Sequence, residues 1–350
     1  MATIYDVAKQ AGVSTATVSR SFSKTNRMSA ETRQRVLEVA ELLNYRPRRA
    51  QLAVETPSAE RQVVLTDPIG FQFFAHAESE TAQTNAFYAP LLHGAQAETE
   101  ASGRHLLLFT MHRHHFSGEL PRMVCKKQLA GILLVGTADP EILTAFYAHI
   151  PYIILVDNWD VTGQHDSIVS NGFEGAFAAT RYLFELGHRQ IGFAMSEPQT
   201  LTFRDRLHGY LAAHFECHAP VDPRLVIQAD PMDTFAPQVQ ALLSSPQRPT
   251  ALMTANDMQA YTVMQIARDM GLEIPGDLSL VGFDNERYSA LAYPPLTTVN
   301  VDTETMGRLA IRRLLHRLKE AEQGVPPERP IQITVPVSLV VRDSCCPLRG

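Results

Sequence analysis

Small hydroxyl side chains and one arginine lie close together near the start of the chain, at spacings that suit contact with DNA. Ser14, Thr17 and Ser19 offer hydroxyl groups that can bind phosphate oxygens. Arg20 is the next residue, and a guanidinium can contact a guanine through two hydrogen bonds. These residue types indicate a surface that lies against double-stranded DNA.

Two short helices joined by a tight turn are needed to position these side chains. Thr3 can cap the first helix, and Gly12 can end it because glycine tolerates the left-handed backbone conformation. Ser14 is a suitable N-cap for a second helix from Thr15 to about Phe22. This pattern predicts a helix-turn-helix, whose second helix enters the DNA major groove. The alternative is an ordinary small helical unit with a polar face.

A third helix and the local charge complete the DNA-binding hypothesis. Ser29 can cap a helix from Ala30 to about Leu43 that packs on the first two. Residues 1–50 hold nine Lys or Arg and four Asp or Glu (net +5), whereas the rest of the chain holds 22 and 33 (net −11). A small basic unit followed by an acidic remainder is typical of a DNA-binding domain joined to a domain that does not bind DNA. The candidate DNA contacts in this unit are Tyr5, Ser14, Thr15, Ala16, Thr17, Ser19, Arg20, Arg27 and Arg33.

From about Val63, apolar runs alternate with stretches of helical periodicity. The expected strands are 69–74, 105–110, 131–135, 152–156, 191–195, 251–254 and 278–283, and the expected helices are 90–101, 175–186, 206–215, 235–243 and 258–270. Such alternation predicts parallel sheets with helices on both faces. A single sheet of this many strands would be large, so we expect an α/β fold of two lobes, each a doubly wound parallel sheet.

Polar residues at the ends of these strands form a candidate ligand site, because ligands bind outside the carboxyl ends of strands in such sheets. Asp157 and Asp284 each follow an expected strand, Asn256 and Asp257 follow a third, and Arg206 begins an expected helix. Carboxylates, an amide and a guanidinium can bind vicinal hydroxyls, as in a sugar. The alternative for the first three is a turn or a helix cap, and for Arg206 a structural salt bridge. The aromatic candidates for stacking on a sugar are Phe87, Tyr88 and Trp159.

The chain resembles the lactose-repressor/galactose-repressor (LacI/GalR) family of bacterial transcription factors over nearly its whole length. The matching motifs are 3–8, 11–14, 17–20, 32–33, 36, 45–47, 85–94, 157–158, 186–192, 206–209, 255–257, 281–284 and 294–299. The resemblance implies a periplasmic-binding-protein-like core and a homodimer on near-palindromic operator DNA, controlled by a small-molecule effector. It marks as effector contacts the positions of Phe87, Tyr88, Asp157, Arg206, Asn256 and Asp284. Trp159 is added from its residue type alone.

The segment 46–62 matches the position of the family's hinge, which forms a helix in the minor groove of operator DNA. There, a pair of leucines opens a central base step. In this chain Arg48 stands where the family usually has Asn, Val54 aligns with the wedge leucine, and Leu52 lies two residues earlier. Leu52 and Val54 are therefore both candidate DNA contacts, and a plain flexible basic linker is the alternative.

The resulting domain organisation has a helix-turn-helix domain at 1–45, a hinge at 46–62, a ligand-binding and dimerisation core at 63–342 and a tail at 343–350. Within the core we expect one lobe at about 63–169 plus 301–330, and the other at about 170–300 plus 331–342. We expect the cytoplasm as its location, since the sequence has no basic-plus-apolar leader and no apolar run long enough for a membrane span.

Other classes of function are less well supported by the sequence. The nucleotide-binding, hydrolase and metalloprotease motifs are missing, so we do not expect an enzyme. We expect no metal and no cofactor, because 111–116 has histidines without a completing carboxylate or cysteine, and the four cysteines show no paired spacing. The alternative function is a sugar-binding protein or hydrolase whose N-terminal unit contacts a protein. The alternative effector is a purine or another small metabolite.

Overall fold

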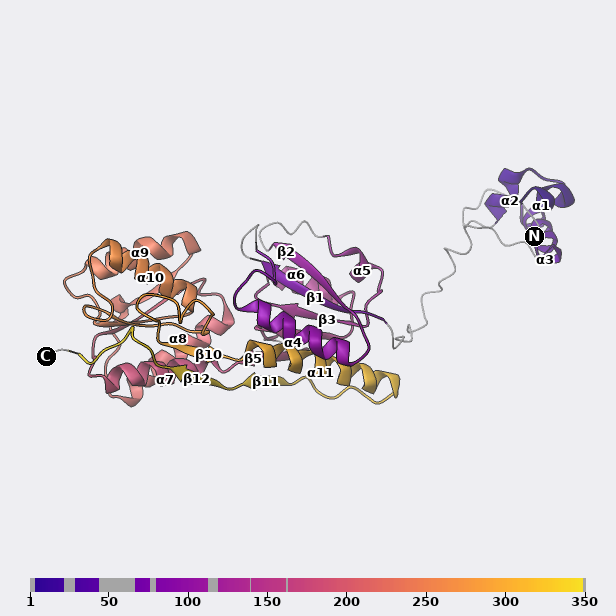
Figure 1. Ribbon diagram of the computed structural model, residues 1–350. Coiled ribbons are helices and arrows are strands. Elements are labelled where there is room, and N and C mark those ends of the chain that lie inside the picture. The colour runs from indigo at the N-terminus through magenta and orange to yellow at the C-terminus, as the bar shows by residue number, and fades with distance from the viewer. Residues whose placement is uncertain are drawn as a thin grey trace. The chain divides into compact units, whose positions relative to one another are not determined.

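Two compact units make up the chain, Met1–Gln62 and Val63–Gly350 (Figure 1). The computed structural model of the protein describes residues 4–21, 29–43, 67–75, 80–112, 119–138, 140–161 and 163–348. No helix among these residues is long and apolar enough to cross a lipid bilayer.

Three helices form the first unit: α1 (Ile4–Ala11), α2 (Thr15–Ser21) and α3 (Ala30–Leu42). Gly12 separates α1 from α2 with a φ of 66°, which glycine adopts without strain. Ser14 caps α2, since its Oγ accepts a hydrogen bond from the Thr17 amide at 3.2 Å. The small core of this unit consists of Val7, Ala8, Ala11, Val18, Val36 and Ala40. The predicted helix-turn-helix arrangement is confirmed.

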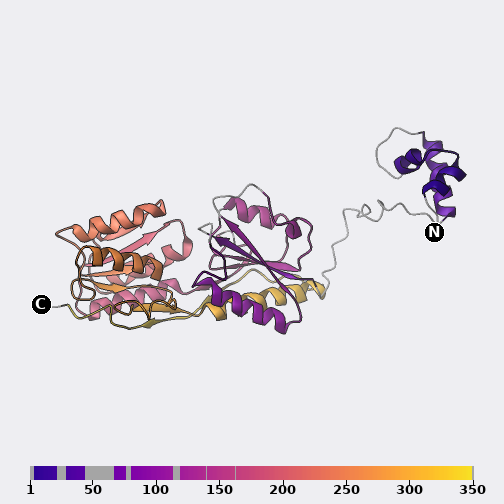
Figure 2. The same cartoon turned by 45° about the horizontal axis from the view of Figure 1, so that its top comes forward.

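The first lobe of the second unit is built on a six-stranded parallel sheet with the order β11-β5-β4-β3-β1-β2. Its strands are β1 (Ile69–Ala75), β2 (Leu106–His112), β3 (Gly131–Val135), β4 (Ile153–Val156), β5 (Asp166–Ser170) and β11 (Gln332–Val335). Helices α4 (Tyr88–Ala101) and α11 (Thr303–Glu322) cover one face, and α5 (Arg122–Cys125) and α6 (Pro140–Tyr147) cover the other (Figures 1 and 2).

Alternation along the strands explains why these runs are apolar throughout. Ile132 and Leu134 pack in the core beneath α5 and α6, whereas Leu133 and Val135 pack in the core beneath α4 and α11. Successive side chains of a strand point to opposite faces, so a strand covered on both faces needs an unbroken apolar run. The predicted doubly wound parallel sheet is confirmed for this lobe.

The second lobe has a four-stranded parallel sheet with the order β7-β6-β8-β9. Its strands are β6 (Ile191–Ser196), β7 (Val226–Ala229), β8 (Ala251–Thr254) and β9 (Ser279–Val281). Helices α7 (Gly172–Glu185) and α8 (Leu201–Glu216) cover one face, and α9 (Phe235–Ser244) and α10 (Asp257–Asp269) cover the other. Short 3-10 helices η3 (Pro223–Leu225) and η4 (Met232–Thr234) flank β7.

Three segments of the chain connect the two lobes. β5 leads into α7, β10 (Thr298–Val301) leads into α11, and β11 leads into β12 (Val337–Val340). β10 and β12 pair antiparallel beside the second sheet. The assignment of 331–342 to the second lobe is wrong for its first half, because β11 pairs with β5 in the first sheet. Pro336 falls between the two strands, where a residue without an amide hydrogen interrupts the ladder.

The last described residues pack against the second lobe rather than forming a free tail. Ser344 Oγ donates a hydrogen bond to the Leu280 carbonyl at 2.6 Å and accepts one from the Thr297 amide at 2.8 Å. The Leu348 amide bonds the Leu186 carbonyl at 2.9 Å. The C-terminal segment therefore holds β9 and the end of α7 together.

Candidate functional site

The first unit presents part of the predicted nucleic-acid interface on α2. Ser14 is exposed, Thr15 and Thr17 are half-buried, and the hydroxyls of Ser14 and Thr17 lie 2.9 Å apart. The Ser14 hydroxyl thus serves first as the cap that sets the start of α2. The side chains of Tyr5, Ala16, Ser19, Arg20 and Arg33, and the residues Arg27, Leu52 and Val54, lie outside the part of the chain that the structure describes, so their roles stay predictions.

A cavity of about 220 Å³ opens between the two lobes of the second unit. Phe87 and Pro90 line it from the first lobe, Asp284 and Glu286 line it from the second, and Val301 lines it from a connecting segment. The loop after β9 and the start of α4 therefore form its opposite walls. Two of the seven predicted effector residues, Phe87 and Asp284, lie directly in the lining.

A larger cavity of about 350 Å³ lies between β7 and α9, far along the chain from these residues. Its one charged lining residue, Arg224, has its guanidinium bound to Asp222 at 2.6 Å. This cavity gathers none of the predicted site residues. We therefore place the candidate ligand site between the lobes.

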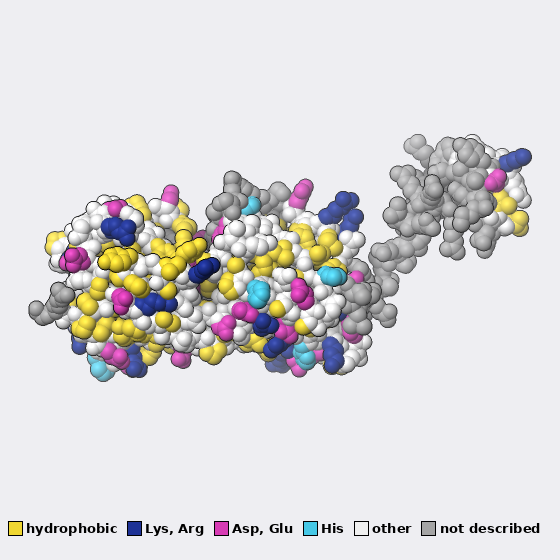
Figure 3. Space-filling view, in the orientation of Figure 1, with side chains coloured by type: hydrophobic (Ala, Val, Ile, Leu, Met, Phe, Trp, Pro, Cys, Tyr) yellow, Lys and Arg dark blue, Asp and Glu magenta, His cyan; other side chains and the backbone are white. Residues whose placement is uncertain are grey.

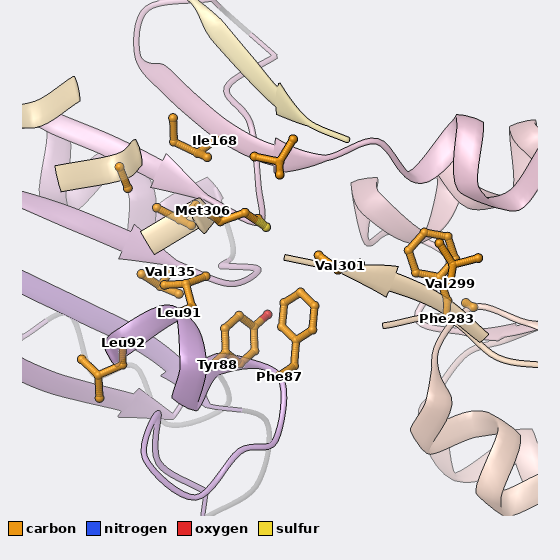
Figure 4. Close-up of a cluster of buried hydrophobic side chains, with 14 of the residues drawn as sticks. Phe87, Tyr88, Leu91, Leu92, Val135, Ile168, Phe283, Val299, Val301 and Met306 are labelled. Atoms are coloured by element: carbon orange, nitrogen blue, oxygen red, sulfur yellow. The ribbon is translucent and has the colours of Figure 1, made fainter. Parts of the chain in front are cut away.

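Tyr88 and Asp157 meet at the first-lobe side of the cleft. The Tyr88 hydroxyl donates a hydrogen bond to Asp157 Oδ2 at 2.7 Å, and both side chains are buried. Burial and the neighbouring Asp157 carboxylate raise the pKa of Tyr88 well above its usual value, so the phenol stays protonated and remains a donor. The Phe87 and Tyr88 rings stand edge to face, 5.0 Å apart, at the start of α4 (Figure 4).

Arg206 and Asp284 form a buried ion pair on the second-lobe side. Arg206 Nη2 lies 3.0 Å from Asp284 Oδ1, and the side chains are 2% and 6% exposed. The guanidinium also donates to the Ala255 carbonyl and lies 3.8 Å from the centre of the Phe283 ring. Three different elements thus hold the arginine plane in place. The expectation that Arg206 begins a helix is wrong, because α8 begins at Leu201 and Arg206 lies in its second turn.

Asp257 is a buried carboxylate that the sequence did not single out as a ligand residue. Its Oδ1 accepts a hydrogen bond from Thr298 Oγ1 at 2.6 Å, and its Oδ2 accepts one from the Glu286 amide at 2.9 Å. Burial raises the pKa of Asp257 to about 7, which the two hydrogen bonds and Arg206 only partly oppose. Asp257 therefore fixes the loop that carries Asp284 and Glu286 against β10.

The three strand-end residues combine structural and site roles. Asn256 is the N-cap of α10, because its side chain accepts a hydrogen bond from the Gln259 amide at 2.9 Å. Asp157 and Asp284 adopt φ angles of 57° and 110°, in the left-handed region that is costly for residues other than glycine. The turn and cap formation weighed as alternatives for these residues is thus observed, and of the three it is Asp284 that lines the cavity. Trp159 is half-buried and does not line the cavity.

Electrostatic coupling links the two sides of the cleft. Burial raises the pKa of Asp284 well above its usual range, and the Asp257, Glu286 and Asp157 carboxylates raise it further while Arg206 opposes them. Asp157 belongs to the first lobe and the others to the second, so a carboxylate of the first lobe contributes to the raised pKa of a carboxyl group in the second. A ligand held between them would meet an acidic surface with one buried guanidinium.

One group of described residues has the spacing of metal ligands, namely His316, Glu320 and Glu328. The two glutamates are already ion-paired: Arg313 lies 3.1 Å from Glu328, and Arg317 lies 3.5 Å from Glu320. Two guanidinium groups beside the carboxylates oppose the binding of a cation. The histidine-rich segment 111–116 falls mostly outside the described residues.

Two family models match this chain. The model described as bacterial regulatory proteins, lacI family, matches residues 3–48, and the model described as periplasmic binding protein-like domain matches residues 180–345. The first match covers α1, α2 and α3. The second covers most of the second lobe, two of the three connecting segments, and α11 and β11 of the first lobe.

Curated relatives match along almost the entire chain. The HTH-type transcriptional repressor PurR of Haemophilus influenzae (strain PittEE) is 31% identical over 352 residues, which cover 98% of each chain. The repressor of the same name from Escherichia coli O139:H28 (strain E24377A / ETEC) is 32% identical over 98% of this chain and 97% of its own.

Solved structures share the fold over the same range. The transcriptional regulator CelR in complex with cellobiose has a TM-score of 0.71 at 24% identity. The match covers 98% of this chain and 100% of the CelR chain. The lac repressor dimer bound to operator and the anti-inducer ONPF has a TM-score of 0.63 at 25% identity, covering 99% of both chains. The helix-turn-helix followed by two lobes is therefore an architecture shared with known regulators.

Proposed function

This chain belongs to the lacI family of bacterial regulatory proteins, and from that premise we propose that a small molecule bound between its lobes controls its affinity for a near-palindromic operator. The protein is a DNA-binding transcriptional regulator and not an enzyme. It represses transcription in the cytoplasm, where its operator lies. The observation that carries the proposal is the buried Arg206–Asp284 pair beside a cavity between the lobes, in a chain that also carries a helix-turn-helix.

The hinge geometry transmits the effect of the ligand in this account. Three segments connect the lobes, so a ligand that binds both walls changes the angle at which the lobes close. For this to change operator affinity, the ligand must bind the two closure states with different affinity. The segment 46–62, with Leu52 or Val54 in the minor groove, is the proposed link between the lobes and the DNA.

A sugar is the proposed class of effector. The carboxylates of Asp157 and Asp284 and the guanidinium of Arg206 are suited to hydroxyl groups, and the Phe87 ring offers an apolar face. Asn256 completes the set of proposed contacts through the amide that caps α10. A purine or another small metabolite is the alternative, which the similarity to repressors named PurR supports.

A homodimer is proposed as the assembly that reads both halves of the operator, as two-fold symmetry of a near-palindrome requires. Exposed hydrophobic side chains gather over parts of the second lobe (Figure 3). Tyr288, Leu291 and Tyr293 lie within six residues of one another and are 61%, 73% and 87% exposed. Large exposed apolar side chains in one segment mark an interaction surface.

A thermal-shift screen against neutral sugars, sugar phosphates and nucleobases tests the proposed function. A ligand present at about 100 times its dissociation constant stabilises the folded core by about 2.7 kcal/mol, which such a screen detects. The expected hit is a sugar whose effect disappears in Asp284→Ala. A purine hit would replace the effector class and keep the regulator, whereas a hit that Asp284→Ala does not affect would place the ligand elsewhere.

A further inference from the structure

Glu286 has a buried carboxylate without a hydrogen-bonding partner among the residues that the structure describes. The residue is 8% exposed and lines the cavity between the lobes, and its Oε2 is fully buried. Within the described part of the chain, its carboxylate makes no hydrogen bond and no ion pair. Burial raises the pKa of Glu286, and no cation among the described residues lowers it. A buried acceptor without a partner is expensive, so such a group is usually completed by a bound molecule.

The other carboxylates around the cleft already have partners. Asp157 accepts the Tyr88 hydroxyl, Asp284 is paired with Arg206, and Asp257 accepts two hydrogen bonds. At the edge of the cavity, Asp302 caps α11 through the Thr305 amide at 2.9 Å, and Glu304 lies 2.7 Å from Arg308. Glu286 is therefore the carboxylate of the cavity lining that has neither a hydrogen bond nor an ion pair among the described residues.

The backbone of Glu286 holds the side chain at the cavity. Its amide donates to Asp257 Oδ2 at 2.9 Å, and its carbonyl accepts from Ser289 Oγ at 2.7 Å. Both partners are buried, so these bonds fix the position of the Glu286 backbone at the cavity wall. Arg287, the adjacent cation in the lining, is exposed and forms no ion pair with Glu286 among the described residues.

The charge balance of the cleft selects the chemistry of the ligand. Asp157, Asp257, Asp284 and Glu286 are four buried carboxyl groups, and within the described part of the chain Arg206 is the buried guanidinium that lowers the pKa values of Asp257 and Asp284. A cation bound among these groups would favour their ionised forms against the raised pKa values of Asp257, Asp284 and Glu286, whereas an anion such as a sugar phosphate would favour the protonated forms. A hydroxyl group would supply a donor without a counter-charge, whereas an ammonium group supplies both.

We propose that the effector is a polyhydroxylated amine, such as an amino sugar, whose ammonium group binds the Glu286 carboxylate. Its hydroxyls then bind the Arg206–Asp284 pair and Asp157. This inference rests on the proposed function, because it assigns the ligand of the same cleft. Glu286 is the residue that distinguishes the amine from the neutral sugar.

Matched ligands test this proposal on the full-length protein. Glucosamine, galactosamine and mannosamine are each compared with the parent hexose and with the N-acetyl derivative, which lacks the charge, by thermal shift and titration calorimetry. Glucose 6-phosphate serves as the anion. We expect at least one amine to bind about tenfold or more tightly than its parent and its N-acetyl form, since a hydrogen bond between charged groups is lost in both.

Glu286→Gln removes the charge and keeps the shape of the side chain. We expect it to weaken amine binding about tenfold or more and to leave the affinity for the parent hexose within a few fold. Glu273→Gln, the same change at an exposed position of the second lobe, is the matched control and should alter neither. Binding of none of the amines, or amine binding that Glu286→Gln does not weaken, would overturn the proposal. Operator release by a neutral sugar or a purine would overturn it too, while leaving the proposed function intact.

Discussion

Arg206 and Asp284 form an ion pair of 3.0 Å in which both side chains are almost fully buried. Arg206 comes from the second turn of α8 and Asp284 from the loop after β9, so the pair joins two elements beside the cleft. Burying two charges costs folding free energy unless the pair has good geometry and other groups complete its hydrogen bonds. The Ala255 carbonyl and the Phe283 ring complete the surroundings of the arginine.

Removing one partner of this pair should therefore destabilise the second unit and abolish the ligand response. For Arg206→Ala we expect the free energy of unfolding to fall by about 3–5 kcal/mol, because Asp284 is left buried without its counter-charge. Urea denaturation measures this loss. Arg204→Ala, an exposed arginine of the same helix, is the control and should change stability by less than about 0.5 kcal/mol.

If Arg206→Ala proves too unstable to purify, Asp284→Asn tests the same site with a smaller change of shape. It should lose the ligand response while still binding operator, because Asp284 lies in the second unit and the helix-turn-helix in the first. A variant that responds to ligand as the unmodified protein does would show that the pair is structural only.

Tyr88→Phe should weaken the first-lobe side of the site without disturbing the core. The ring packs against Phe73 at 4.9 Å and would be kept, whereas the 2.7 Å hydrogen bond to Asp157 would be lost. We expect a loss of about 1–3 kcal/mol in unfolding free energy, as for a hydrogen bond to a charged group, and weaker ligand binding. Tyr147→Phe is the control, since the Tyr147 hydroxyl has no hydrogen-bond partner among the described residues. Equal effects of the two variants would contradict this account.

The fold was predictable from the sequence wherever a strand is buried on both faces. Gly131–Val135 and Ala251–Thr254 were placed at their observed bounds, because a short unbroken apolar run is typical of a strand covered on both faces. β5 and β7 were not predicted. β5 (Asp166–Ser170) begins with a buried aspartate and contains two serines, so it lacks the apolar run by which the other buried strands were predicted. Arg317 and Arg313 neutralise Asp166 from α11, a contact between segments about 150 positions apart that no local pattern reveals.

The candidate site was predictable by residue type and less so by geometry. Asp157, Asn256 and Asp284 were identified because they follow strands, and the structure adds that each also shapes its own turn or cap. Asp257 was placed at the same strand end as Asn256 but was not included among the effector contacts. Glu286 was not identified as a member of the cleft. Glu286 follows no strand directly, and its burial depends on the packing of the loop against β10 and α10.

Asp257 should make the stability of the second unit depend on pH in a defined direction. In the unfolded chain its carboxyl loses a proton at about pH 4, whereas burial raises the folded-state pKa of Asp257 to about 7. The folded state thus binds more protons within this window. The contribution of Asp257 to stability is present in full below about pH 4 and is lost as the pH rises to about 7.

Comparison with Asp257→Asn isolates this contribution from other titrating groups. The unmodified protein should lose stability relative to the variant as the pH rises from about 4 to about 7, with a constant difference above that. Urea unfolding at several pH values measures the difference. Asp269→Asn, the same change at an exposed position of α10, is the matched control. A difference for Asp257→Asn that does not change with pH would mean that burial does not raise the pKa of Asp257.

Arg20→Ala should relax the DNA specificity predicted for the second helix of the first unit. We expect a loss of about 1–3 kcal/mol in operator binding and reduced discrimination at one base pair of each half-site. Binding is measured by fluorescence anisotropy on operator and single-base variants, at several salt concentrations because phosphate contacts are salt-dependent. Arg35→Ala, an exposed residue of α3 outside the predicted contacts, is the control. A uniform loss across all sequences would assign Arg20 to the phosphate backbone instead.

The most direct test of the central claim is the affinity of the full-length protein for its operator, with and without a ligand that stabilises the second unit. The operator is first selected from random double-stranded DNA, and binding is compared with a scrambled sequence. If the claim is correct, the protein binds a near-palindromic site at least about 1,000-fold more tightly than scrambled DNA. Its affinity for that site then changes by about 5- to 150-fold when the ligand is added. Equal affinity for both DNAs, or an operator affinity that the bound ligand leaves unchanged, would contradict it.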